Sequence, residues 1–217
     1  MTTICIAPRC DKKRAIGALF CARHMLAPAA RRGGWLSAWK RARERAAAQP
    51  EEVAMDMSNI SPRLWVGARP PFDRDLPDFD VLVLCAQEIQ PAVLGFGRQV
   101  LRVPLPDSAL TTEETRRALI GGRRVAEALV AGNRVLVTCQ QGMNRSALVA
   151  SLALGHVTRM TAPQIITLVR SRRTPGVPAD QGALRNPHFC DLIGRFVGAR
   201  QAQWRSSAAQ AARRRPR

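Results

Sequence analysis

Short apolar runs alternate along the chain with longer segments of helical periodicity. The apolar runs have strand length and are bounded by turn residues, which predicts strands near residues 63–66, 80–84, 99–104 and 134–138. The longer segments predict helices near residues 112–129, 144–156, 162–172 and 187–197. A capping box, Thr161 to Gln164 with Pro163 in the first turn, supports the third helix start. Because strands alternate with helices, we expect an α/β fold whose central, mostly parallel sheet is flanked by helices.

The strand predicted near 134–138 runs directly into Cys-x5-Arg-Ser, from Cys139 to Arg145 and Ser146, and then into a helix. A short loop between a strand and a helix N-terminus turns its backbone N–H groups toward one anion. Such surroundings lower a cysteine pKa from about 8.5 to about 3.5–7.5, which favours a nucleophilic thiolate at Cys139. The planar guanidinium of Arg145 can hold two phosphate oxygens. The pattern therefore predicts a phosphate-binding cysteine site, whose loop residues are Gln140, Gln141, Gly142, Met143, Asn144 and Arg145.

This motif and its surroundings resemble the dual-specificity (Tyr and Ser/Thr) group of cysteine phosphatases. The resemblance runs from about residue 60 to 197, with landmarks at 60–67, 81–86, 103–107 and 186–189. It implies the cysteine-phosphatase fold for a domain spanning 52–199. It also implies phosphomonoester hydrolysis through a Cys139 phosphocysteine intermediate, with no cofactor in the catalysis.

The resemblance also assigns roles to three further residues. These enzymes take a general acid from an aspartate upstream of the cysteine strand, and Asp107 fits because it lies in a Pro-rich turn after a strand. A plain helix-entry aspartate is the alternative. Ser146 matches the hydroxyl that bonds the cysteine sulfur, and it also suits a helix cap. Thr138 stands where the family usually has histidine, so the activation of Cys139 depends on other groups.

The loop residues narrow the substrate class. Gln140, Gln141, Met143 and Asn144 are uncharged, whereas phosphatases of highly phosphorylated inositides tend to carry lysines there, so a phosphorylated protein is the favoured substrate. The sequence Gly-Met-Asn-Arg at 142–145 is similar to the Gly-Phe-Asn-Arg of RNA 5′-triphosphatases, which makes RNA 5′ ends the second class. A catalytically weak module that binds phosphate or nucleic acid is the third reading. A loop rich in Pro, Gly and Arg, 172–185, is predicted beside the site, where it would help admit the substrate.

Charge is distributed unevenly along the 217 residues, of which 46% are hydrophobic. The formal net charge of +18 divides into +9 for residues 1–50, +3 for 51–199 and +6 for 200–217. Basic flanks attract polyanions such as nucleic acid, although solvated, solubilising segments are an equal alternative. We interpret 31–51 as a basic helical linker and 200–217 as a basic tail that is disordered or a frayed helix.

The first thirty residues contain a second motif, Cys5-x4-Cys10-x10-Cys21-x2-His24. Three thiols and one imidazole complete a tetrahedral zinc site. A segment this small has too little apolar surface to fold without a bound metal or another cross-link. The pattern resembles short zinc knuckles, which implies a structural Zn²⁺ within residues 1–30. Unpaired or disulfide-bonded cysteines are the alternative. Cys85 and Cys190 are expected to be buried, with Cys85 a possible disulfide partner of an oxidised Cys139.

No secretory signal is recognised at the N-terminus, since residues 1–10 lack an apolar core region. The longest apolar run, 147–154, is too short to span a bilayer, so no transmembrane segment is expected. A reactive thiolate and zinc thiolates both require reducing conditions. The expected location is therefore the cytoplasm.

Overall fold

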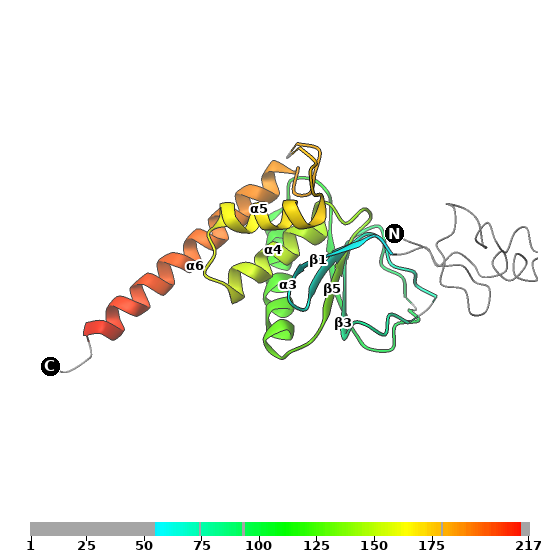
Figure 1. Cartoon of the computed structure of the whole chain (residues 1–217), viewed down its shortest axis with the longest axis horizontal. Helices are drawn as coiled ribbons and strands as arrows, with labels where there is room; N and C mark the ends of the chain where they lie inside the picture. The colour runs from blue at the N-terminus through cyan, green and yellow to red at the C-terminus, as the bar shows by residue number, and fades with distance from the viewer. Residues whose placement is uncertain (1–54, 74, 93, 179, 214–217) are drawn as a thin grey trace, which may run out of the picture. The chain divides into compact units, whose positions relative to one another are not determined.

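The computed structural model describes residues 55–73, 75–92, 94–178 and 180–213 (Figure 1). In this part of the chain five strands form one sheet in the order β1-β2-β5-β3-β4. β1 pairs antiparallel with β2, and the other neighbours are parallel. The strands are β1 (Met57–Ser61), β2 (Leu64–Gly67), β3 (Val81–Ala86), β4 (Gln99–Leu105) and β5 (Val135–Thr138). The predicted α/β fold with a mostly parallel sheet is confirmed.

The central strands β3 and β5 are buried along their whole length. Strands covered on both faces read as continuous apolar runs, which is why the sequence predicts them clearly. Their register pairs Leu84 with Thr138. The carboxyl ends of these two strands therefore meet at one edge of the sheet, where Cys139 follows β5.

The two faces of the sheet are covered differently. On one face lie helices α3 (Thr112–Val130), α4 (Arg145–Val157), α5 (Ala162–Arg173) and α6 (Pro187–Arg213) (Figure 1). α4 lies innermost and is buried from Arg145 to Gly155. On the other face a smaller apolar cluster, including Phe79 and Phe96, packs against Leu82 and Leu136. Irregular segments between the strands supply this second cover.

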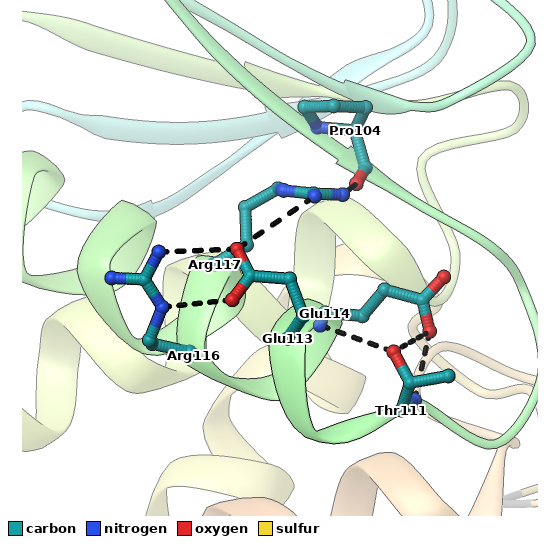
Figure 2. Close-up of polar contacts among 6 residues, drawn as sticks. All are labelled: Pro104, Thr111, Glu113, Glu114, Arg116 and Arg117. Atoms are coloured by element: carbon teal, nitrogen blue, oxygen red, sulfur yellow. Dashed lines mark hydrogen bonds and ion pairs between the residues drawn. The ribbon is translucent and has the colours of Figure 1, made fainter.

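Local hydrogen bonds fix the start of α3 (Figure 2). Thr111 and Glu114 form a capping box, in which the Thr111 N–H donates to Glu114 Oε2 at 2.8 Å and the Glu114 N–H to Thr111 Oγ1 at 3.3 Å. Arg117 Nη1 donates to the Pro104 carbonyl at 3.0 Å, which ties the first turns of α3 to β4. The connection that carries Asp107 is thus held at both ends. The capping box predicted at Thr161 is also present.

Two elements differ from the prediction. β1 was not predicted, because its sequence Met-Ser-Asn-Ile-Ser lacks an apolar run and the strand lies at the sheet edge, paired on one side only. It joins β2 through a tight turn in which Arg63 has a φ of +66°. α6 continues to Arg213 instead of ending near 197, so residues 200–213 of the predicted tail are helical. This stretch is rich in alanine, the residue with the highest helix propensity.

Candidate active site

Cys139 lies immediately after β5, and Arg145 is the first residue of α4. Both side chains are only 5% exposed. The Cys139 N–H donates to the Gly67 carbonyl at 3.3 Å, which continues the pairing of β5 with β2 past the last strand residue. The loop between Cys139 and Arg145 thus starts from the centre of the sheet and ends at a helix N-terminus, as the sequence predicts.

The carbonyl groups of the loop all bond to groups outside it. Across a trans peptide bond the carbonyl and the next N–H point in opposite directions, so outward carbonyls at 140–143 turn the amides of 141–144 inward. None of the described residues accepts a hydrogen bond from these four amides. The carbonyl contacts are Gln140 with Arg69 N (3.2 Å), Gln141 with Arg173 Nη2 (3.0 Å), Gly142 with Arg173 Nε (3.0 Å) and Met143 with Leu184 N (2.9 Å).

Gly142 lets the loop pass close to the sheet. Its φ is +69°, and a Cβ built on it would lie 2.6 Å from the Gly67 carbonyl carbon and 2.8 Å from the Ala68 nitrogen. Both neighbours are backbone atoms that cannot rotate away. Only glycine fits this position without moving the loop or the end of β2.

Arg145 presents one edge of its guanidinium to the loop. Its hydrogen bonds all leave from Nη1, to Glu88 Oε2 at 2.5 Å and to the Leu105 carbonyl at 3.4 Å. The buried Nε has no partner among the described residues. The Nε and Nη2 edge is therefore free of partners among the described residues and could bind two oxygens of one anion, the bidentate geometry expected for phosphate.

Glu88 is a site residue that the sequence analysis missed. Its hydrogen bond from Arg145 lowers the pKa of this half-exposed carboxyl, although burial acts in the opposite direction. For Arg145, burial lowers the pKa, but Glu88 and the nearby Cys139 and Asp107 outweigh it and raise the pKa overall. The available signal was position, since Glu88 closely follows β3 at the edge where Cys139 lies.

Ser146 lies beside Cys139, with its Oγ 3.2 Å from the Cys139 Sγ. The hydroxyl is fully buried, and either atom can donate in this contact. The helix-cap reading of Ser146 is wrong, because the N-cap residue of α4 is Asn144, whose side chain makes no capping bond. The serine instead contacts the sulfur directly.

Asp107 lies on the connection after β4 and is brought to the loop by Asn144. Asn144 Nδ2 donates to Asp107 Oδ2 at 3.2 Å. Asn144 Oδ1 accepts from the backbone N–H groups of Arg185 at 3.1 Å and Asn186 at 3.4 Å. The loop predicted beside the site therefore does contact it, through Leu184 and Arg185. One asparagine joins the catalytic loop, the aspartate and the segment before α6.

Thr138 is buried, and its hydroxyl donates to the Val83 carbonyl at 2.9 Å. That bond joins β5 to the neighbouring strand β3. Thr138 thus stabilises the sheet, and its hydroxyl donates no hydrogen bond to the loop between Cys139 and Arg145.

A second arginine supports the loop from behind and was also missed. Arg173, at the end of α5, is 8% exposed and donates to two loop carbonyls as described above. Its Nη1 and Nη2 also contact the two carboxylate oxygens of Asp56 at 2.6 and 2.7 Å. This bond lowers the pKa of Asp56, although burial opposes the shift. We call Arg173 and Asp56 the loop clamp.

The two other cysteines of this part of the chain are free. Cys85 is fully buried, as predicted, and burial raises the pKa of its thiol well above the usual value. Cys190 is only partly buried, and its thiol donates to the Leu184 carbonyl at 3.2 Å.

The predicted zinc ligands Cys5, Cys10, Cys21 and His24 and the predicted linker 31–51 lie outside the described residues. Within the described ranges no group of three or more His, Cys, Asp or Glu side chains is placed to hold a metal ion. No described helix is both long enough and apolar enough to cross a membrane.

A parallel sheet whose central strand ends in a Cys-x5-Arg loop is the arrangement of dual-specificity and tyrosine phosphatase domains, and the fold matches solved structures of that class. Human DUSP28 superposes with a TM-score of 0.53 at 20% identity, over 69% of this chain and 97% of its own. Tk-PTP in its active form gives a TM-score of 0.54 at 21% identity, over 66% of this chain and 97% of its own. The human tyrosine phosphatase-like serine/threonine/tyrosine-interacting protein gives 0.50 at 19%, over 66% and 96%. No known family's sequence profile and no curated protein matches the chain.

Proposed function

We propose that the protein is a phosphomonoester hydrolase of the dual-specificity or tyrosine phosphatase type. The observation that carries this proposal is the loop after β5, in which four amides and the buried Nε of Arg145 have no partner among the described residues, next to Cys139. Inward amides, a helix N-terminus and a guanidinium together make a site for a dianion. The fold similarity supports the same class.

The reaction proceeds in two steps. The Cys139 thiolate attacks phosphorus, the bond to the leaving oxygen breaks, and the Asp107 carboxyl donates its proton to that oxygen. Water then attacks the phosphocysteine, giving its proton to Asp107, and the sulfur leaves as thiolate with the Ser146 hydroxyl donating to it. Arg145 and the loop amides hold the phosphoryl oxygens throughout. General acid help of this kind contributes about 10² to 10⁴ in rate.

A phosphorylated protein is the favoured substrate class, and RNA 5′ phosphate is the second. The uncharged loop side chains supply no extra cations for a highly phosphorylated inositide. The first experiment measures phosphate release from a phosphotyrosine peptide, a phosphothreonine peptide and a 5′-triphosphorylated RNA at pH 6 to 7 under reducing conditions.

Two variants accompany this experiment. Cys139→Ser should abolish release, while Cys190→Ser, which also removes a thiol outside the loop, should leave it unchanged. Release by Cys139→Ser equal to that of the native protein would exclude the thiolate mechanism. Release from RNA alone would move the substrate class to RNA 5′ ends.

A second function, phosphate capture without turnover, is favoured by one observation. The Thr138 hydroxyl bonds to Val83 and not to the catalytic loop, so the support that the family draws from a histidine is missing here. Binding of phosphopeptide by the native protein, with no release from any of the three substrates, would support this function.

We also propose that residues 1–30 hold one structural Zn²⁺ through Cys5, Cys10, Cys21 and His24. The support is the ligand spacing, and the donors fit zinc because thiolate and imidazole are its preferred ligands. Atomic emission of the purified protein should find one zinc per chain, and Cys21→Ser should lose it while Cys85→Ser keeps it. The thiol chemistry further supports a cytoplasmic location, which a fluorescent fusion would test.

A further inference from the structure

The chain beyond Asp191 is strongly basic. It contains no aspartate or glutamate, and seven arginines follow: Arg195, Arg200, Arg205, Arg213, Arg214, Arg215 and Arg217. The second half of α6 extends past the other helices of the domain (Figure 1). The catalytic proposal assigns no role to this charged helix.

Two arginines flank a tryptophan at the base of this extension. The Arg159 guanidinium carbon lies 5.6 Å from the centre of the Trp204 ring, and that of Arg200 lies 5.2 Å from it. Cation–π contact holds both guanidiniums in place. Arg200 Nη1 also donates to Gln203 Oε1 at 3.4 Å, whereas the Arg159 guanidinium donates no hydrogen bond to the described residues. Arg205, the next residue of α6, is exposed. We call Arg159, Arg200, Trp204 and Arg205 the α6 basic face.

The positive charge of this face is not compensated. Arg159, Arg200 and Arg205 form no ion pair with any carboxylate of the described residues. The buried Arg200 Nε also has no partner among them. Uncompensated charge of this density attracts a polyanion and releases its counterions.

A groove of about 590 Å³ adjoins the basic face, and Arg200 lines both. Its other charged or titratable lining residues are Arg123, His156 and Glu127, and Arg123 Nε donates to Glu127 at 2.8 Å. Burial lowers the pKa of His156, and the positive charges of Arg200 and Arg123 lower it further. Because Arg123 is paired with Glu127 and the lowered pKa of His156 favours its neutral form, Arg200 supplies the uncompensated positive charge of this groove.

The basic face lies far from the catalytic loop. α4 has 13 residues between Arg145 and Val157, which spans about 20 Å at 1.5 Å per residue, and Arg159 follows its far end. A long ligand bound there would leave the Cys139 loop open. This surface therefore has a role separate from the catalytic step.

We propose that the α6 basic face binds the phosphate backbone of single-stranded nucleic acid. Arginine edges fixed on an aromatic ring suit phosphate oxygens, and a groove beside them gives room for the strand to continue. A lipid surface fits less well, because the large apolar side chain of the face, Trp204, is in contact with two guanidiniums. The proposal stands whether or not Cys139 turns over a substrate.

The test uses the full chain and a fluorescein-labelled single-stranded RNA of about 20 nucleotides, with fluorescence anisotropy measured over a range of KCl concentrations. The double variant Arg159→Gln/Arg200→Gln is compared with Arg116→Gln/Arg124→Gln, which removes equal charge from exposed arginines of α3. For single strands each lost phosphate contact lowers the slope of log K against log salt by about 0.7. The first variant should lose about 1.4 in slope and about tenfold in affinity at 0.15 M salt.

Equal RNA binding by the two double variants would overturn the proposal. Absence of RNA binding by the native protein at about 50 mM KCl would also overturn it. Tighter binding to vesicles with phosphatidylserine, lost only in the first variant, would assign the face to membranes instead. Arg159→Lys/Arg200→Lys retains the charge and should keep most of the RNA affinity, which separates charge loss from misfolding. Turnover of p-nitrophenyl phosphate should be equal in all variants. This assay tests the phosphatase proposal separately from the RNA-binding proposal.

Discussion

The close approach of the catalytic loop to β2 can be tested with two glycines. Gly142 and Gly176 both have positive φ, +69° and +75°, so alanine pays a similar backbone penalty of about 1 kcal/mol at either position. They differ in their surroundings, because a Cβ at Gly176 meets nothing within 4 Å, whereas at Gly142 it meets backbone atoms at 2.6 and 2.8 Å. Gly176→Ala is thus a matched control for Gly142→Ala.

The expected difference follows from those distances. Ordinary carbon contacts are about 3.5–4.0 Å, so Gly142→Ala must displace the loop or the end of β2 by several tenths of an ångström or more. Overpacking of this kind costs about 1–3 kcal/mol beyond the backbone penalty. A displacement approaching 1 Å at the reacting groups also costs about 10²-fold in rate.

Urea denaturation and phosphatase assays of the two variants measure both effects. Gly142→Ala should lower the free energy of unfolding by about 2–4 kcal/mol and kcat/KM by about 10- to 100-fold. Gly176→Ala should cost about 1 kcal/mol and leave kcat/KM within about threefold. Equal losses in the two variants would refute the argument that the loop is held against the sheet by contact at Gly142.

Four further substitutions test individual groups of the site. Asp107→Ala should lower kcat about 10²-fold or more on phosphothreonine peptide. The loss should be much smaller on p-nitrophenyl phosphate, because its leaving group needs no proton. Equal losses on the two substrates would show that Asp107 is not the general acid. Ser146→Ala should slow phosphocysteine breakdown about 10-fold, seen as a burst of one product per enzyme, and the absence of a burst would contradict this role. Thr138→Val should cost about 1 kcal/mol in unfolding free energy and leave kcat within about twofold, whereas a large loss of kcat would show that its hydroxyl acts on the loop. Glu88 has a lowered pKa in the folded state, so its carboxylate stabilises the fold above its ordinary pKa of about 4.3 and this contribution disappears as the pH falls. Glu88→Gln should therefore reduce the loss of unfolding free energy between about pH 5 and 3, and an unchanged pH profile would argue against the Arg145 pair.

The parts of the fold that the sequence predicts well are those with a local cause. The buried strands β3 and β5 are apolar because both faces are covered, and the start of α5 is marked by the capping box at Thr161. β1 has no such signal, since an edge strand with exposed residues reads as a polar segment. The length of α6 was missed because its second half is stabilised by helix propensity and the Trp204 stack and not by an apolar stripe.

The residues of the candidate site can likewise be divided into those with a local sequence signal and those without one. Cys139, Arg145 and Ser146 lie within one short motif, so their proximity follows from the sequence. Glu88 and Asp56 reach the site only through the fold, and Asp56 pairs with an arginine 117 residues further along the chain. A charged residue in a connecting segment usually faces solvent, so the position of Glu88 just after β3 was a weak signal and Asp56 had none.

The loop clamp also bears on where the phosphatase-like domain begins. The resemblance to phosphatases starts near residue 60, and the first strand starts at Met57, yet the carboxylate that holds Arg173 belongs to Asp56. A domain trimmed to its first strand would keep every strand and helix described here and still lose the anion behind the catalytic loop. The unit that supports the Cys139 loop is therefore larger than the sheet and includes at least Asp56, the residue before β1.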